Sequence, residues 1–365
     1  MSILMNKNYE EVLVAGAYRN ERGLSLVELM IALALSSALI LGIFTVYIDS
    51  SQTSRMSTAL ARIQESARIA TDVMARDMRM VGFQGCADPN SVTMNIIANN
   101  PPTTDFFEST LRGWEVTDSN WAGGTEFDDE PIESSAVIGS DVIVVQRGDT
   151  MEIELTGNMS ANNANIQVAG DDIDMFSQND IVMISDCEAA DLFRISSNPS
   201  SGTWAHANNV NTTNRLGQAY QSSARIMRFS SSAYFVADTG RDDARGGDIF
   251  ALYRQVNNLD GTALAPQEIV EGVENLQIEY GERLPSGNIR FRPADQVDDM
   301  GVVVALRLGM LISHSDPVRD DVDSSDYSLP GQIITASSSG GTVTHPEDNR
   351  LRRTFTTTIT LRNRD

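Results

Sequence analysis

The sequence predicts an α+β protein in which a long N-terminal helix, first membrane-spanning and then amphipathic, packs on a β-rich, mainly antiparallel body. Three observations lead to this prediction. Residues 29–47 form an uncharged apolar stretch, and apolar residues then recur every three or four positions as far as Val81. From residue 87 onward, short β-like runs are separated by stretches rich in Asn, Asp, Ser and Gly, with no regular alternation with long helices.

The apolar segment at residues 24–48 is long enough to cross a membrane. Its uncharged core measures roughly 28 Å at about 1.5 Å per residue, which matches the hydrocarbon core of a bilayer. The leader at residues 1–23 is polar, and no small-x-small cleavage site follows the apolar segment. An ordinary secretory signal has the opposite order, because its apolar part comes first and is then removed.

Glu28 is the one charged residue inside this apolar segment. A carboxylate in hydrocarbon costs a few kcal/mol, so such a residue is usually functional and usually paired. From the residue alone, two interpretations stay open. Glu28 lies at the membrane interface and reaches water, or it serves a function that needs a partner.

Residues 49–81 predict that the helix continues as an amphipathic one. The segment contains neither Pro nor Gly before Gly82, so a continuous helix from Leu24 to Met80 would measure roughly 85 Å. A coiled coil is the alternative, but the β-rich body that follows can cover the same face. The apolar positions that define one helix face are Met56, Leu60, Ile63, Ala67, Ala70, Met74 and Met78.

The body at residues 82–365 is expected to consist of short strands. A short helix is expected at 267–273, a long loop at 315–350 and a weak subdomain boundary near 220–245. The expected strands lie at 141–147, 150–155, 165–169, 180–185, 191–195, 233–237, 248–254, 275–280, 301–312 and 353–361.

Composition restricts the class of partner. The 365 residues include 27 Lys and Arg against 50 Asp and Glu, which gives a net charge of −23. Such a chain is a poor binder of the phosphate backbone of nucleic acids or of an anionic membrane surface, since both require clustered Lys and Arg. Direct nucleic-acid binding is therefore not expected.

The residues around Glu28 resemble a known processing signal. Glycine at position 23, the run LSLVE and the apolar helix together resemble the class III signal of type IV pilins and of type II secretion pseudopilins. The resemblance implies that a prepilin peptidase cuts between Gly23 and Leu24 and methylates the new amine of Leu24. It also implies that Glu28 pairs with the Leu24 ammonium of a neighbouring subunit in a filament core. The chain departs from the family where Leu24 replaces the usual Phe and Thr45 replaces a Pro common in major pilins.

Runs in the body resemble the PilW family of minor pilins; they lie at 80–86, 140–147, 270–281 and 352–364. The resemblance implies a structural subunit of a type IV pilus, anchored in the inner membrane with its body in the periplasm and later located at the pilus tip on the cell surface. The implied partners are other minor pilins, the major pilin and a PilY-family tip adhesin, in a complex that primes assembly. Two alternatives are a J-type pseudopilin of type II secretion and a membrane-anchored periplasmic enzyme or binding module.

The two cysteines, Cys86 and Cys187, are expected to form a disulfide. Cys86 follows the glycines that end the predicted helix, and Cys187 closes the β-like run 180–187. The expected membrane orientation places both in an oxidising compartment, where two such cysteines often pair. The alternative is a pair of separate buried thiols.

Motifs for catalysis, cofactors or metals are not found, so an enzyme is not expected. The three histidines, at positions 206, 314 and 345, are far apart, and the sequence contains no HExxH, GxSxG or P-loop. The acidic cluster at 316–326 is a candidate calcium loop, but it lacks the Gly and terminal Glu of an EF-hand, so a solvated loop is expected instead. No cofactor is implied.

Overall fold

The computed structural model describes residues 23–101, 109–118, 121, 130–258 and 260–364. The chain forms two compact units, residues 1–54 and 55–365. Helix α1 (Leu26–Met78) is continuous and contributes to both units. This helix and the antiparallel strands of the larger unit confirm the predicted fold class.

The part of α1 in the first unit is apolar and uncovered. Residues 23–50 are all exposed, and Leu26 keeps 74% of its surface accessible. By length and composition the helix can cross a membrane. None of the described residues therefore buries this surface.

The part of α1 in the larger unit has one buried face. Most of the buried residues recur every three or four positions, because that spacing places them on one side of a helix. The buried residues are Ala59, Ile63, Ala67, Ala70, Met74, Ala75, Asp77 and Met78. All of them except Asp77 form one core with Ile143 and Tyr234 from one sheet and Leu306 and Leu308 from another. The predicted amphipathic helix is present and packs on both sheets.

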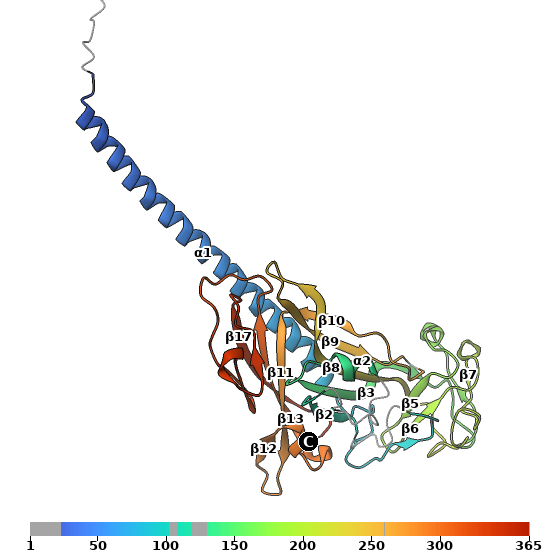
Figure 1. Cartoon of the computed structure of the whole chain (residues 1–365). Coiled ribbons are helices and arrows are strands. Elements are labelled where there is room, and N and C mark those ends of the chain that lie inside the picture. The colour runs from blue at the N-terminus through green and yellow to red at the C-terminus, as the bar shows by residue number, and fades with distance from the viewer. Residues whose placement is uncertain (1–22, 102–108, 119–120, 122–129, 259, 365) are drawn as a thin grey trace, which may run out of the picture. The chain divides into compact units, whose positions relative to one another are not determined.

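The larger sheet has eight strands in the order β1-β6-β5-β8-β3-β2, with β9 paired to β8 and β10 to β9 (Figure 1). All pairs are antiparallel except β1 with β6. The residues near 220–245, where the sequence suggests a boundary, form the long central strand β8. The strands are β1 (Asn95–Ile96), β2 (Leu111–Glu115), β3 (Asp141–Glu154), β5 (Ile181–Ser185), β6 (Ala190–Arg194), β8 (Arg225–Asp242), β9 (Asp248–Val256) and β10 (Gln267–Glu271).

The second sheet has four antiparallel strands in the order β12-β11-β13-β17. They are β11 (Val273–Arg283), β12 (Ile289–Arg292), β13 (Val303–Ser313) and β17 (Arg352–Thr360). The smaller elements are α2 (Glu130–Ser135), β4 (Ile166–Gln167), β7 (Thr203–Trp204), β14 (Tyr327–Leu329), β15 (Gln332–Ala336), β16 (Thr344–His345) and the 3₁₀ turns at 171–175, 199–201, 294–296, 300–302 and 337–339.

Two expectations for the body are wrong. The segment expected to be a helix at 267–273 is strand β10 followed by Gly272, which joins β10 to β11. Gly272 has a φ of +88° and leaves no room for a Cβ next to the Ser313 carbonyl, so the chain turns there instead of continuing as a helix. The expected loop at 315–350 contains β14, β15 and β16.

A pair of carboxyl groups lies where the two sheets meet. Glu115 on β2 and Asp141 on β3 are register partners, and the Ile278 amide of β11 donates a 2.6 Å hydrogen bond to Asp141 Oδ2. The Ala294 amide donates to Glu115 Oε1 at 3.2 Å. Burial, followed by the charge of Glu115, raises the pKa of Asp141 well above its usual range. The pair therefore favours a protonated Asp141 in the folded protein.

Candidate assembly site

The start of α1 is closed by a reciprocal capping box between Ser25 and Glu28. The Glu28 amide donates to Ser25 Oγ at 3.2 Å, and the Ser25 amide donates to Glu28 Oε2 at 2.9 Å. Each side chain thus satisfies a main-chain N–H that the first helical turn leaves unpaired. The cap at Ser25 was not predicted above, although Ser-x-x-Glu before an apolar run is a known helix-start signal.

This capping box brings the predicted processing and assembly residues together. Gly23 and Leu24 directly precede Ser25, and all of them are exposed. Within the described residues, no Lys, Arg or His lies within 4.0 Å of the Glu28 carboxylate. Capping supplies the carboxylate with one N–H, but no positive charge among the described residues compensates its negative charge.

Asp77 fastens the far end of α1 to the larger sheet. Its carboxylate is buried, and the Tyr234 hydroxyl donates to Oδ2 at 2.6 Å. Arg147 Nη2 lies 3.2 Å and Arg254 Nη2 lies 2.8 Å from the Asp77 oxygens. Burial and the nearby Asp77 charge raise the pKa of Tyr234.

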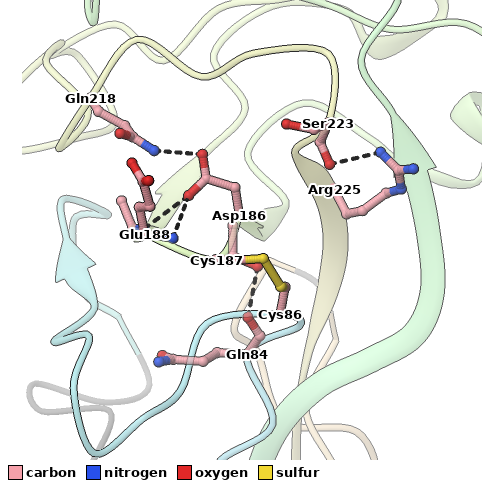
Figure 2. The surroundings of a disulfide bond; sticks show 10 residues. Gln84, Cys86, Asp186, Cys187, Glu188, Gln218, Ser223 and Arg225 are labelled. Carbon is pink, nitrogen blue, oxygen red and sulfur yellow. Dashed lines mark hydrogen bonds between the residues drawn. A yellow bond between two sulfur atoms is a disulfide. The ribbon is translucent and has the colours of Figure 1, made fainter.

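The segment after α1 is attached to the same sheet by main-chain bonds and a disulfide. The Gly82 amide donates to the Gln146 carbonyl at 3.0 Å, and the Gly148 amide donates to the Phe83 carbonyl at 2.7 Å. The disulfide joins Cys86 to Cys187, with their Cα atoms 4.7 Å apart (Figure 2). The expected bridge is therefore present in the structure and links the end of the helix to the turn after β5.

The surroundings of the disulfide are also hydrogen-bonded. Ser185 Oγ donates to the Gln84 carbonyl at 2.7 Å, and these two residues lie two positions before Cys187 and Cys86 in the sequence. Asp186 accepts bonds from the amides of Glu188 and Ala189, both at 2.9 Å, and so closes the β5–β6 turn. Gly85, with a φ of +75°, has no room for a side chain, since an added Cβ would lie 2.5 Å from Ser185 Oγ.

One residue of the acidic cluster at 316–326, Asp323, is engaged in ion pairs. Asp323 is fully buried, and Arg319 Nη1 and Arg352 Nη1 lie 2.8 Å and 3.3 Å from its oxygens. Burial opposes its ionisation, but hydrogen bonds from Tyr327 and Ser325, together with these arginines, lower the pKa of Asp323. Among the described residues, no group of three His, Cys, Asp or Glu is arranged to hold a metal ion. The one buried carboxylate of this cluster is thus paired with two arginines.

The chain has two matches to family models. Residues 233–363, from within β8 to beyond β17, match the type IV pilus-assembly protein W family, PilW. Residues 18–44 match the prokaryotic N-terminal methylation motif, which includes Gly23, Leu24 and Glu28. This motif implies processing by a prepilin peptidase and a membrane-anchored precursor that later joins a pilus.

Similarity to individual proteins is weak and does not help to assign the family. A type IV-like pilin from Thermus thermophilus is similar over 83% of this chain and 98% of its own, at 14% identity and a TM-score of 0.34. A likeness this weak does not contribute to the assignment. No curated protein matches the chain. The methylation motif at the start of α1 and the PilW match in the body together support a type IV pilus minor pilin of the PilW family.

Proposed function

We propose that this minor pilin is cut after Gly23, methylated at the Leu24 amine and held in the pilus by an ion pair between Glu28 and the Leu24 amine of a neighbouring subunit. The observation that carries the proposal is the position of Glu28. It is the one charge in an exposed apolar helix, four residues from the new N-terminus. Packing many such helices together excludes water, and an unpaired carboxylate there would be costly, so a cationic partner is favoured.

Before assembly, the subunit is anchored in the inner membrane and its body lies in the periplasm. Two features support this orientation. The disulfide requires an oxidising compartment, which the periplasm provides. The many acidic residues lie outside the apolar helix, apart from Glu28, and suit a body that stays in water.

In the pilus, the subunit acts at the tip, where it joins other minor pilins, the major pilin and a PilY-family adhesin and primes assembly. This role follows from the family and needs no catalytic centre. The disulfide between Cys86 and Cys187 within the body supports a scaffold role, because it restrains the fold covalently. No cofactor and no direct contact with nucleic acid are part of the proposed role.

The test compares variants at the start of the helix in the bacterium that makes the pilus. Glu28→Gln keeps the capping box, because Gln caps as Glu does, but it removes the charge. We expect normal amounts of this variant in the membrane and about tenfold less in sheared pili, since the charge pair is lost. Glu65→Gln, at an exposed site on the same helix, is the matched control. An unmodified Met1 in the mature protein, or normal incorporation of Glu28→Gln, would contradict the proposal.

A further inference from the structure

Strand β17 is an edge strand with an unusually regular structure. Its nine residues pair with β13 in an unbroken register, from Arg352 opposite Ser313 to Thr360 opposite Ala305. The strand contains no Pro and no bulge. Within the described part of the chain, no strand pairs with its other side.

The register identifies the main-chain groups on the open side. The Leu351 carbonyl accepts from the His314 amide at 3.0 Å, and the Leu361 amide donates to the Val304 carbonyl at 2.9 Å. The N–H and C=O groups of successive residues alternate between the two edges of a strand. In β17, the N–H and C=O groups of the odd-numbered residues therefore point toward β13. The even-numbered residues Thr354, Thr356, Thr358 and Thr360 therefore present their N–H and C=O groups to the open side. Their side chains are exposed, and their main chain has no hydrogen-bond partner among the described residues on that side.

The other edges of the two main sheets are much better protected. Strand β12, at the opposite edge of the same sheet, has four residues, two of them Arg, and is followed by Pro293. Strands β2 and β10 have five residues each and include charged side chains. Short length, charge and Pro are the usual ways in which proteins block edge-to-edge pairing. Since β17 lacks these features along its Thr-rich middle, it is suited to receive another strand.

Positive charge marks both ends of this open edge. At one end, Arg353 Nη1 donates to the Arg352 carbonyl at 3.0 Å, which places the guanidinium on the open side. At the other end, the Arg362 amide donates to the Arg79 carbonyl at 3.4 Å, and both of these side chains are exposed. None of the three guanidinium groups has a carboxylate within 4.0 Å among the described residues. In a chain with a net charge of −23, this is a local site for an acidic partner.

A second copy of the same strand fits this edge poorly. Antiparallel pairing of two β17 strands would set Arg353 of one copy near Arg362 of the other at both ends. Like charges opposite each other destabilise a strand pair. The charge pattern therefore favours a strand from a different protein.

We propose that the open edge of β17 pairs with an extended, acidic segment of a different pilin subunit in the same pilus. The Thr354–Thr360 main chain supplies the hydrogen bonds, and Arg353 and Arg362 select for acidic side chains at the ends of the incoming strand. The proposal deepens the proposed function and depends on it, since the partner is met only in an assembling pilus.

The experiment places the photo-crosslinker p-benzoylphenylalanine at Thr358 of the full-length chain and maps adducts in membranes by mass spectrometry. The expected adduct joins this chain to an acidic extended segment of another pilin. Thr356→Pro removes one open-side N–H without removing a bond to β13, so it should reduce the adduct by about tenfold. Thr356→Val keeps the N–H, remains a good strand former and should leave the adduct unchanged. Arg353→Glu with Arg362→Glu changes exposed side chains alone and should also reduce the adduct by about tenfold.

The outcomes separate this proposal from the proposed function. If Thr356→Pro does not accumulate as a disulfide-bonded protein, the double Arg variant decides the question. The edge proposal would be overturned if the variants that accumulate as disulfide-bonded protein gave as much crosslinked adduct as the wild type. Adducts that join two copies of this chain would also overturn it. The proposed function would still hold if the wild-type chain carried methylated Leu24 and entered sheared pili. Absence of methylation and of incorporation in the wild type would overturn the proposed function instead.

Discussion

The hydroxyl of Tyr234, in the middle of β8, donates a 2.6 Å hydrogen bond to the Asp77 carboxylate in the last turn of α1. Arg147 from β3 and Arg254 from β9 meet the same carboxylate. Three adjacent strands are therefore held to one helical turn by a single buried charge. Such a network fixes which face of the helix packs on the sheet, because its hydrogen bonds and ion pairs can form together in only one orientation of the helix.

Asp77→Ala should destabilise the folded body by about 3–5 kcal/mol, since it leaves the buried Tyr234 hydroxyl and two partly buried guanidinium groups without their acceptor. Tyr234→Phe removes one hydrogen bond to a charged group and should cost about 1.5–3 kcal/mol. Urea unfolding of the detergent-solubilised mature chain measures both. Glu65→Ala, which breaks an exposed pair with Arg68, serves as the control and should change stability by less than about 1 kcal/mol. Equal small losses in all three variants would contradict a structural role for the Asp77 network.

Asp141→Asn should stabilise the protein at pH 7 and have little effect at pH 3. The folded pKa of Asp141 is raised, so the stability associated with its proton is present below the unfolded pKa and is lost as the pH rises toward the folded one. Asn keeps an acceptor for the Ile278 amide and carries no charge at either pH. Thermal melts at several pH values should show a gain on the order of 1 kcal/mol that grows with pH. The exposed Asp72→Asn is the control, and a loss of stability at pH 7 in Asp141→Asn would contradict the expectation.

Replacing Cys86 or Cys187 with Ser should lower the free energy of unfolding by up to about 4–5 kcal/mol, because the bridge closes a long loop in the unfolded chain. Either single variant should lose as much as the double variant, since each one breaks the same bond. Chemical unfolding with and without reductant measures the loss. Two free thiols in denatured, unreduced protein would show that the bridge is absent.

Ser25→Ala should separate helix capping from charge pairing. It removes the side-chain acceptor for the Glu28 amide, at a cost of about 0.5–2 kcal/mol to the first turn, but leaves the Glu28 charge in place. We expect a smaller fall in pilus incorporation than for Glu28→Gln, measured by immunoblot of sheared pili relative to membranes. A fall as large as that of Glu28→Gln would show that the cap, and not the charge, limits assembly.

The sequence predicts the helix and most strands because their patterns are local. Apolar spacing defines the buried face from Ala59 to Met78, and β-branched runs mark β3, β11 and β13. The helix wrongly expected at 267–273 shows the limit of such patterns, since its Glu residues are compatible with a helix but pair with β9 in the fold. Pairing between distant segments, like a single glycine at positive φ, leaves little trace in local composition.

The methylation motif at 18–44 was recognisable for the same reason, since Gly23, Leu24 and Glu28 lie within one short segment. Asp77 was not, because its partners come from 70 and 157 residues away. The open edge of β17 was equally hidden, since strand order decides which strand ends a sheet. A run of Thr residues is compatible with an edge strand and with a central strand of a sheet, so it does not distinguish the two.

The position of the disulfide has a mechanical consequence. Pulling between α1 and the C-terminal strands would load the covalent bridge directly, from Cys86 to Cys187, and so bypass the 101 positions that separate them. Strands β1, β2, β3 and β5 would carry none of that tension along their main chain. With the disulfide reduced, the segment between the two cysteines could extend to about 340 Å, at roughly 3.3–3.6 Å per residue. The disulfide therefore limits how far a subunit can extend under tension, and it protects the larger sheet from unfolding.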